Sequence, residues 1–341
     1  MTVIDVTIAC EFDLAAMEAL DGDGLRLSFF GAPPCFQLDG GRIIPACKDD
    51  FESVVSHLTR RSIPFNLCCN TVLGPDEVEI DRQTWRTIDR LYSPENGIIV
   101  SRHWLAERIR ERYPEFRFVF SSIGALAEAW DEELLFSAYD VVVCPIERIN
   151  DFRFLSAAAR WRKLEVFLNC GCHRFRPGCI DHYRHISEAN NAMRAAEERG
   201  CLAEGLSATN PGIEPSVIDV SRYLRLGVRR FKCLERTYTR QDFTGYLDRV
   251  RSASAMSGGV AALQQSLADA SDPGQRLKIL VRLVQLGADD ELRAMKAELS
   301  KVEEASDPGH AAVVDAALRT LRAADAEWAE AWAAERSLPG R

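Results

Sequence analysis

Short apolar runs alternate with amphipathic stretches over roughly the first 235 residues of the chain. The apolar runs predict buried strands, and the apolar residues at helical spacing between them predict covering helices. The predicted strands are Val3–Cys10, Leu25–Phe30, Phe65–Asn70, Gly97–Ser101, Arg117–Ser121, Tyr139–Val143, Lys163–Leu168, Gly205–Ala208 and Val228–Cys233. The predicted helices are Phe51–Arg61, Gln83–Tyr92, Trp104–Tyr113, Ile123–Phe136, Phe152–Arg162 and Ala189–Gly200. Such alternation implies a mainly parallel sheet covered by helices.

A doubly wound sheet and a (β/α)8 barrel both have this alternation, and a glycine-rich phosphate turn distinguishes the first from the second. A doubly wound sheet usually carries a glycine-rich phosphate turn after its first strand, and this chain has none. The Gly-Asp-Gly at 22–24 precedes a strand and does not open a helix, so it is a turn. About eight β/α repeats in some 240 residues fit a (β/α)8 barrel. We therefore expect a TIM-like barrel over residues 1–251.

The pattern changes near Ser252. The sequence SASAMSGG is typical of a linker, and the residues after it are rich in Ala and Leu with a helical period. The segment ASDPG occurs at 270–274 and again at 305–309, and Asp followed by Pro is a helix-start signal. We expect a helical extension over 257–341, either a two-unit helix-pair repeat or an appendage with chance repetition of one cap. One apolar face, which could pack on the barrel or dock on a partner, comprises Val314, Ala317, Leu318 and Leu321.

The charge and hydropathy of the chain indicate which kinds of partner it binds and where in the cell it is found. The formal net charge is −9 at pH 7, which argues against a nucleic-acid backbone as the main partner. The N-terminus has no basic segment followed by an apolar run, so we expect no signal peptide. No apolar stretch approaches the roughly 18 residues that a membrane span requires. We expect a soluble, cytoplasmic protein.

The chain has 11 cysteines, and their number is odd. Nothing indicates export, so metal binding or plain burial is a better account of them than a disulfide framework. Those in or beside apolar runs, which we expect to be core residues, are Cys10, Cys47, Cys68, Cys69 and Cys144.

Five further cysteines follow the predicted strand at 163–168. Cys170, Cys172 and Cys179 follow it, and Cys201 and Cys233 lie at the edges of later elements. Thiolates at the ends of several strands are the ligands that a 4Fe–4S cluster needs. Plain packing without a metal is the alternative.

A zinc site is a further alternative in the same stretch. It would use Cys170 or Cys172 together with Cys179, His182 and His185, because mixed Cys/His ligation is ordinary for zinc. If a helix begins near residue 180, the two histidines are three apart and share one face of it.

Three local features resemble the collagenase-like peptidase family U32, over roughly residues 1–250. The EVF at 165–167, followed by Cys172 and Cys179, resembles the E-x-F…C-x6-C signature of that family, one residue out of register at its start. The FGAP at 30–33 resembles its early aromatic-Gly-small turn. The FKCLER at 231–236 resembles its F-K-I-E-G-R, without the Glu-Gly pair in register.

The family includes peptidases, proteins that modify RNA bases by hydroxylation, and oxygen-independent hydroxylation proteins that hold a 4Fe–4S cluster with four cysteines. Carried over by position, the resemblance implies Cys172, Cys179, Cys201 and Cys233 as the cluster ligands. The third spacing differs, and Cys170 is an extra candidate that could replace Cys172. The resemblance thus implies oxygen-independent hydroxylation, or a related modification, of a small substrate, with an aromatic compound as one candidate.

The acid–base candidates are charged residues at predicted strand ends, where barrel enzymes place their chemistry. They are Glu11, His103, Glu147 and Lys232. An aromatic substrate would suit a pocket lined by Phe29, Phe30 and Trp104.

Two other functions compete with this hypothesis. The chain could be a non-catalytic cluster-binding or zinc-binding scaffold subunit that pairs with a second copy or a related subunit. A peptidase is less favoured, because the sequence has neither H-E-x-x-H nor G-x-S-x-G.

Overall fold

The computed structural model describes residues 3–10, 12–20, 22–41, 49–169, 179–192, 215–234 and 240–269, together with 279 and 283. The chain divides into two compact units, residues 1–252 and residues 253–341.

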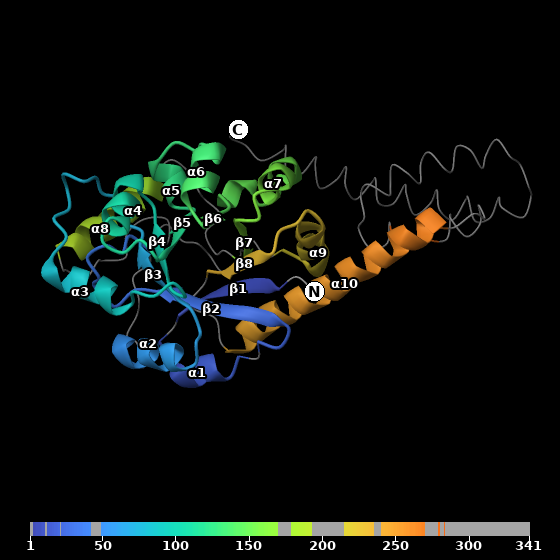
Figure 1. The fold of residues 1–341 in the computed structure, drawn as a ribbon, viewed down its shortest axis with the longest axis horizontal. Coiled ribbons are helices and arrows are strands. Elements are labelled where there is room, and N and C mark those ends of the chain that lie inside the picture. Colours follow the sequence, from blue (N-terminus) through green and yellow to red (C-terminus); the bar gives the residue numbers. More distant parts are fainter. Residues whose placement is uncertain are drawn as a thin grey trace, which may run out of the picture. The chain divides into compact units, whose positions relative to one another are not determined.

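The first unit is a closed barrel of eight parallel strands, as predicted (Figure 1). The strands follow one another around the barrel in chain order, and β1 pairs with β8 to close it. They are β1 (Ile4–Ala9), β2 (Leu25–Gly31), β3 (Phe65–Cys69), β4 (Gly97–Val100), β5 (Arg117–Phe120), β6 (Val141–Val143), β7 (Leu164–Asn169) and β8 (Arg230–Cys233). The (β/α)8 prediction is therefore confirmed.

Strand prediction was accurate for eight of the nine candidates. The strand β6 begins later than predicted because the N–H of Tyr139 still donates to the carbonyl of Leu135 at the end of the preceding helix. The strand β7 pairs directly with β8. The ninth candidate, 205–208, lies outside the described residues.

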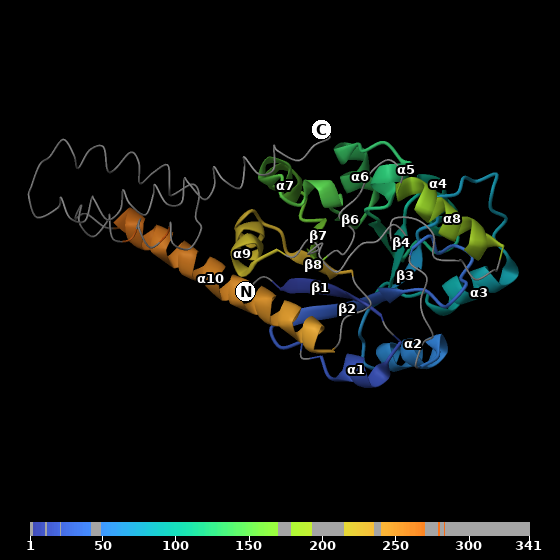
Figure 2. The same ribbon diagram turned by 180° about the vertical axis from the view of Figure 1, so that it is seen from behind.

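Helices cover the outside of the barrel in both views (Figure 2). Asp side chains cap five of them by accepting a backbone N–H in the first turn; these caps are Asp13, Asp50, Asp81, Asp131 and Asp151. The helices are α1 (Leu14–Glu18), α2 (Phe51–Arg60), α3 (Arg82–Arg90), α4 (His103–Arg110), α5 (Gly124–Ala127), α6 (Glu132–Ala138), α7 (Phe152–Ala159), α8 (Cys179–Asn191), α9 (Val217–Arg225) and α10 (Arg240–Asp269), with a short 3₁₀ turn at Ile146–Arg148.

Two helix predictions need correction, and two helices were not predicted. The predicted helix 123–136 is broken into α5 and α6, because Glu128 is extended and Asp131 caps a new helix. The helix α8 begins at Cys179, well before the predicted start at Ala189. The short α1 and the amphipathic α9, which opens with a capping box at Ser216, were not predicted.

The barrel interior is unusually polar. Bulky branched residues normally fill a TIM barrel, but here the buried residues include Thr7, Ser28, Asn66, Glu165 and Lys232. Side chains alternate between the two faces of a strand, so the outward faces remain apolar and pack against the helices. The polar and charged residues that distinguish this barrel therefore lie in its interior.

The second unit is described in part. Buried Val260 packs with buried Leu283, and Leu263, Leu267 and Ile279 lie against them. The predicted linker SASAMSGG is wrong, since residues 252–259 belong to α10; Gly258 and Gly259 each weaken a helix by about 1 kcal/mol relative to Ala without ending it. The ASDPG repeat and the apolar face at 314–321 lie outside the described residues. Within the described part of the chain, no helix is long and apolar enough to cross a membrane.

Candidate functional site

A cavity of about 50 Å³ lies inside the C-terminal end of the barrel. We call it the mouth cavity. Since a water molecule needs about 10–15 Å³ on this measure, it has room for roughly three to five water-sized groups. Residues from the ends of most strands line it, namely Phe30, Gly41, Cys68, Asn70, Ile99, Ser121, Ser122, Ile123, Val143, Phe167, Tyr183, Lys232 and Leu234. The carboxyl ends of barrel strands are where TIM-barrel enzymes bind their substrates.

The helix α8 covers this cavity. It is the first described element after β7, yet it lies beside α4 and α5 and away from β7 in both ribbon views. Its Tyr183 contributes to the cavity wall together with strand residues. The helix therefore crosses the mouth of the barrel and does not take the usual place of a helix outside the sheet.

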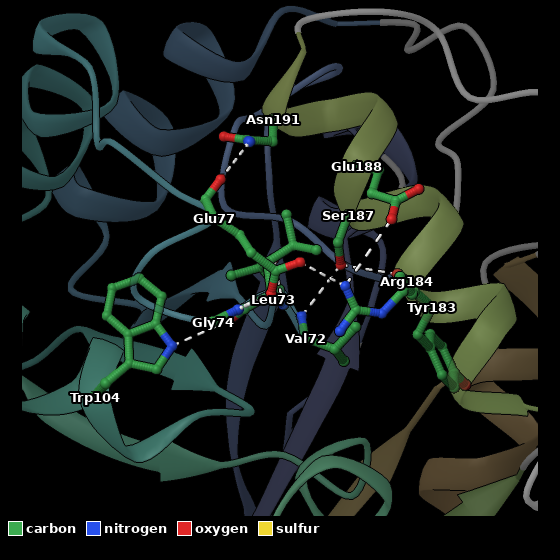
Figure 3. A network of polar contacts seen from close by, with 11 residues as sticks. Val72, Leu73, Gly74, Glu77, Trp104, Tyr183, Arg184, Ser187, Glu188 and Asn191 are labelled. Atoms are coloured by element: carbon green, nitrogen blue, oxygen red, sulfur yellow. Dashed lines mark hydrogen bonds and ion pairs between the residues drawn. The ribbon is translucent and has the colours of Figure 1, made fainter.

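An ion pair and a hydrogen bond, both to Glu77, hold α8 to the loop after β3 (Figure 3). Arg184 Nη1 lies 2.6 Å from Glu77 Oε1, and the N–H of Gly74 donates to the other oxygen of this carboxylate at 2.6 Å. Asn191 donates to the carbonyl of Glu77 at 3.0 Å. The Gly74 hydrogen bond and the Arg184 contact lower the pKa of Glu77.

Buried polar groups of α8 add a second set of contacts. Ser187 Oγ donates to the carbonyl of Tyr183 at 2.8 Å and accepts the N–H of Val72 at 3.2 Å. Asn190 donates to the carbonyl of Asp39, in the loop after β2, at 2.7 Å. Because these groups are buried, leaving one unpaired would be costly, so the contacts specify where α8 lies.

Gly40 permits this close approach. A Cβ atom at this position would lie 2.5 Å from the Asn70 carbonyl oxygen and 2.6 Å from Ser187 Oγ. The N–H of Gly40 also donates to the side-chain oxygen of Asn70 at 3.0 Å. The loop after β2, the end of β3 and α8 thus meet at a point where only glycine fits.

Lys232, the charged residue on the wall of the mouth cavity, belongs to a buried ion pair. Lys232 Nζ lies 3.4 Å from Glu165 Oε2, and each side chain is only 5% exposed. Thr7 donates to Glu165 Oε1 at 2.7 Å, and Ser28 donates to Thr7 at 3.1 Å. Lys232 Nζ also lies 4.1 Å from the centre of the Phe30 ring, as in a cation–π contact.

The strand register explains why these groups meet. Thr7 is the β1 partner of Ser28 on β2 and of Lys232 on β8, so the three residues form one row across neighbouring strands. Burying two charges is expensive even when they are paired. A buried ammonium group on a cavity wall therefore indicates a binding or catalytic site. Together with the hydroxyl and amide groups of the mouth, it could bind a carboxylate or carbonyl oxygen.

The four predicted acid–base residues do not come together. Lys232 lines the mouth cavity. His103 lies outside the barrel, where its Nδ1 is 2.8 Å from the Tyr139 hydroxyl and its ring stacks on Phe120 with centres 5.4 Å apart; burial raises the pKa of Tyr139. Glu147 is exposed in the 3₁₀ turn after β6, and residue 11 lies outside the described part of the chain.

The expected aromatic lining is right for one residue of three. Phe30 lines the mouth cavity, but Phe29 does not, because neighbouring residues of β2 face opposite sides of the sheet. The Trp104 indole donates to the carbonyl of Leu73 at 3.1 Å, and the ring lines a separate surface groove. Sequence reasoning missed Tyr183 as a lining residue and Glu165 as the partner of Lys232. A signal for Glu165 was present, since it is one carboxylate inside an apolar strand.

Of the four predicted cluster ligands, the structure describes the side chain of Cys233 alone. Residues 170, 172 and 201 lie outside the described part of the chain, and Cys179 is placed as the first residue of α8 without its side chain. Cys233 is fully buried, and burial raises the pKa of its thiol. Among the described residues, no three His, Cys, Asp or Glu side chains gather as a metal site would require.

Cys233 and Lys232 face opposite sides of β8. Arg230, Lys232 and Leu234 line the interior cavities, so the alternate position Cys233 faces the helix layer. Cys233 pairs with Asn169, the last residue of β7, whose side chain accepts the N–H of Leu234 at 2.7 Å. The described part of β7 therefore ends at Asn169, beside Cys233.

Comparison with solved structures finds chains of similar fold. The solved structure of the U32 peptidase Mk0906 is similar to this chain with a TM-score of 0.49 and 14% sequence identity, and the match covers 70% of this chain and 94% of that one. No protein-family profile matches the sequence, and neither does any curated protein. At this identity and TM-score, the likeness has no bearing on function.

Proposed function

We propose that this protein is an enzyme that binds a small carboxylate or carbonyl compound in the mouth cavity, with Lys232 as the binding cation. The observation that carries this proposal is the position of the Lys232 ammonium, which is 5% exposed, paired with Glu165 and on the wall of the cavity. A charge in a dry site acts more strongly on a ligand than it would in water.

The other lining groups have separate roles in this proposal. Glu165, oriented by the Thr7 hydroxyl, keeps the ammonium group in place. The hydroxyl groups of Ser121 and Ser122 and the Asn70 amide are donors for further substrate oxygens. The helix α8 excludes water. The aromatic lining residues Phe30, Phe167 and Tyr183 favour a small planar group, such as a carboxylate or a carbonyl.

We further propose that Cys172, Cys179, Cys201 and Cys233 hold a 4Fe–4S cluster. Four thiolates suit such a cluster, and the adjacency of Cys233 to the end of β7 supports the assignment. When bound, the cluster would supply one-electron transfer, as oxygen-independent hydroxylation would require. Because Cys233 faces away from Lys232, the substrate at Lys232 and the cluster would occupy different sides of β8.

A zinc ion is the second candidate, and one observation favours it. Nε2 of His185 is buried and has no hydrogen-bond partner among the described residues. This histidine lies on α8, which opens at Cys179 and also carries His182. A zinc site would use Cys172, Cys179, His182 and His185.

Calorimetric titration of the purified protein with formate, acetate and pyruvate tests the mouth proposal. The double variant Lys232→Met/Glu165→Gln removes the cation without leaving Glu165 as an unpaired charge. We expect its affinity to fall about 10- to 100-fold, as for a lost charge-assisted hydrogen bond. Arg86→Met, at an exposed position of α3, should bind like the wild type. Equal binding by the double variant, or no binding of any carboxylate, would refute the proposal.

Iron, acid-labile sulfide and zinc content, measured after purification without oxygen, test the metal proposal. About four irons and four sulfides per chain would support the cluster. Cys172→Ser, Cys179→Ser, Cys201→Ser and Cys233→Ser should then each lower the iron content. Zinc without sulfide would favour the second candidate, and retention of iron in any of the four variants would show that the ligand set is wrong.

A further inference from the structure

A second interior cavity, of about 20 Å³, lies at the N-terminal end of the barrel. We call it the basal cavity. Its wall carries four cations, Arg26, Arg117, Arg230 and Lys232, and two carboxylates, Asp5 and Glu165. Lys232 and Glu165 pair with each other. The basal end therefore has three guanidinium groups and one carboxylate, an excess of positive charge in a confined space.

Asp5 is shared by two of the three arginines. Arg26 contacts both of its oxygens, at 2.7 and 2.8 Å, and Arg230 Nη1 lies 2.6 Å from Oδ2. The Asp5 side chain is 15% exposed and that of Arg230 is 24% exposed. One carboxylate cannot neutralise two guanidinium groups, so a net positive charge remains beside the cavity even before Arg117 is considered.

Arg117 has a neutral partner. Its Nη2 donates to the side-chain oxygen of Asn66 at 2.9 Å. Burial lowers the pKa of Arg117, and the nearby Arg230 and Arg26 lower it further, against the opposite effect of Glu165 and Asp5. Arginine nevertheless stays charged in proteins.

Two donors in this cluster are unsatisfied. Nε of Arg117 and Nε of Arg230 are both buried without a hydrogen-bond partner among the described residues. A buried donor on a charged group that lacks an acceptor is costly. An anion between these two groups would satisfy both donors and offset the excess charge.

We propose that the basal cavity binds a small inorganic anion of the size of chloride, held by Arg117 and Arg230. The size of the cavity selects the class of ligand, since about 20 Å³ accommodates one or two water-sized groups and is too small for a phosphate. The anion would stabilise the folded barrel, because a ligand that binds only the folded state raises its stability. The Arg26 side chain is 57% exposed, so the arginine cluster extends to the solvent at this end.

Thermal unfolding of the full chain in sodium chloride, with sodium gluconate as the reference at equal ionic strength, tests this proposal. We expect chloride to raise the unfolding midpoint by about 2–4 °C at concentrations well above its dissociation constant. Arg117→Gln should lose this dependence, and Arg86→Gln, which removes the same charge from an exposed position of α3, should keep it. Equal midpoints in the two salts, as expected if only water occupies the cavity, would overturn the proposal, and so would an unchanged chloride effect in Arg117→Gln.

Bromide gives a test that needs no variant. Crystals of the wild-type protein soaked in sodium bromide should show an anomalous peak within hydrogen-bonding distance of Arg117 Nε. Bromide peaks on the protein surface, without one in the basal cavity, would overturn the proposal even if Arg117→Gln fails to fold.

Discussion

The two ends of the barrel interior are built from the same eight strands but carry different chemical groups. Lys232 and Ile99 line both cavities, so the two ends meet at the Lys232–Glu165 pair. On the basal side, guanidinium groups crowd around Asp5. On the mouth side, one ammonium group faces hydroxyl, amide and aromatic groups beneath α8.

The difference shows how one strand, β8, can contribute residues to both cavities. Residues two apart on a strand share a face and are separated by about 6.6 Å along it, so Arg230 lies at the basal end and Lys232 at the mouth. The basal end suits a small ion that stabilises the fold. The mouth suits an organic substrate, because its polar groups are few and varied and a helix covers it.

The largest expected loss of stability comes from removing Lys232 from its ion pair with Glu165, which lies between the two cavities. Lys232→Met leaves Glu165 buried and without its cation, so we expect a loss of about 3–5 kcal/mol in the free energy of unfolding. Urea denaturation followed by circular dichroism measures it. The double variant with Glu165→Gln should recover most of the loss, because Gln can still accept the Thr7 hydrogen bond. If the double variant is as unstable as the single one, the pair is not coupled as the geometry indicates.

A smaller effect is expected from Gly40→Ala, which acts on the mouth alone. The added Cβ would overlap the Asn70 carbonyl and Ser187 Oγ, so α8 or the loop after β2 must shift, at a cost of about 1–3 kcal/mol. Carboxylate affinity should fall while chloride stabilisation persists. Gly24→Ala serves as a matched control, because a Cβ there meets no atom within 4 Å although its φ of +72° adds strain; it should leave carboxylate binding unchanged.

Ser187→Ala should have an effect of similar size, on the attachment of α8. It leaves the N–H of Val72 buried without its acceptor, which costs about 1–3 kcal/mol. Hydrogen exchange at α8 should become faster, whereas exchange at β1 and β8 should not change. Equal acceleration in the barrel strands would mean that α8 is not an independently attached cover.

The smallest effect is expected from the exposed ion pair of α8. The Arg184 and Glu77 side chains are 43% and 44% exposed, so Arg184→Ala should cost no more than about 1 kcal/mol. Because the pKa of Glu77 is lowered from its ordinary value of 4.5, its stabilising contribution is complete above pH 4.5 and disappears as the pH falls through the lowered value. The difference in stability between wild type and Glu77→Gln should therefore shrink in acid. A difference that grows in acid would contradict the assigned direction.

The fold could be predicted because it depends on local patterns. Apolar runs separated by amphipathic stretches specify the strands and helices, and eight such units close into a barrel. Lys232 was identified as a candidate from its place at a strand end. The linker prediction failed because small residues and paired glycines are tolerated inside the long helix α10.

The covering role of α8 could not be predicted from the sequence. Its contacts join residues 107 and 151 positions apart, as in Arg184–Glu77 and Asn190–Asp39, and no local pattern marks such pairs. The position of His103 after a strand predicts a catalytic role, but its side chain faces Tyr139 in the helix layer. The two arginines with unpaired donors, Arg117 and Arg230, lie at strand starts, where sequence reasoning did not look for a site.

Diffraction from one wild-type crystal soaked with both pyruvate and bromide tests the contrast between the two ends most directly. We predict pyruvate in the mouth cavity with a carboxylate oxygen within hydrogen-bonding distance of Lys232 Nζ, and an anomalous bromide peak beside Arg117 Nε. Pyruvate bound only outside the mouth, together with bromide at Lys232 and none beside Arg117, would contradict the account.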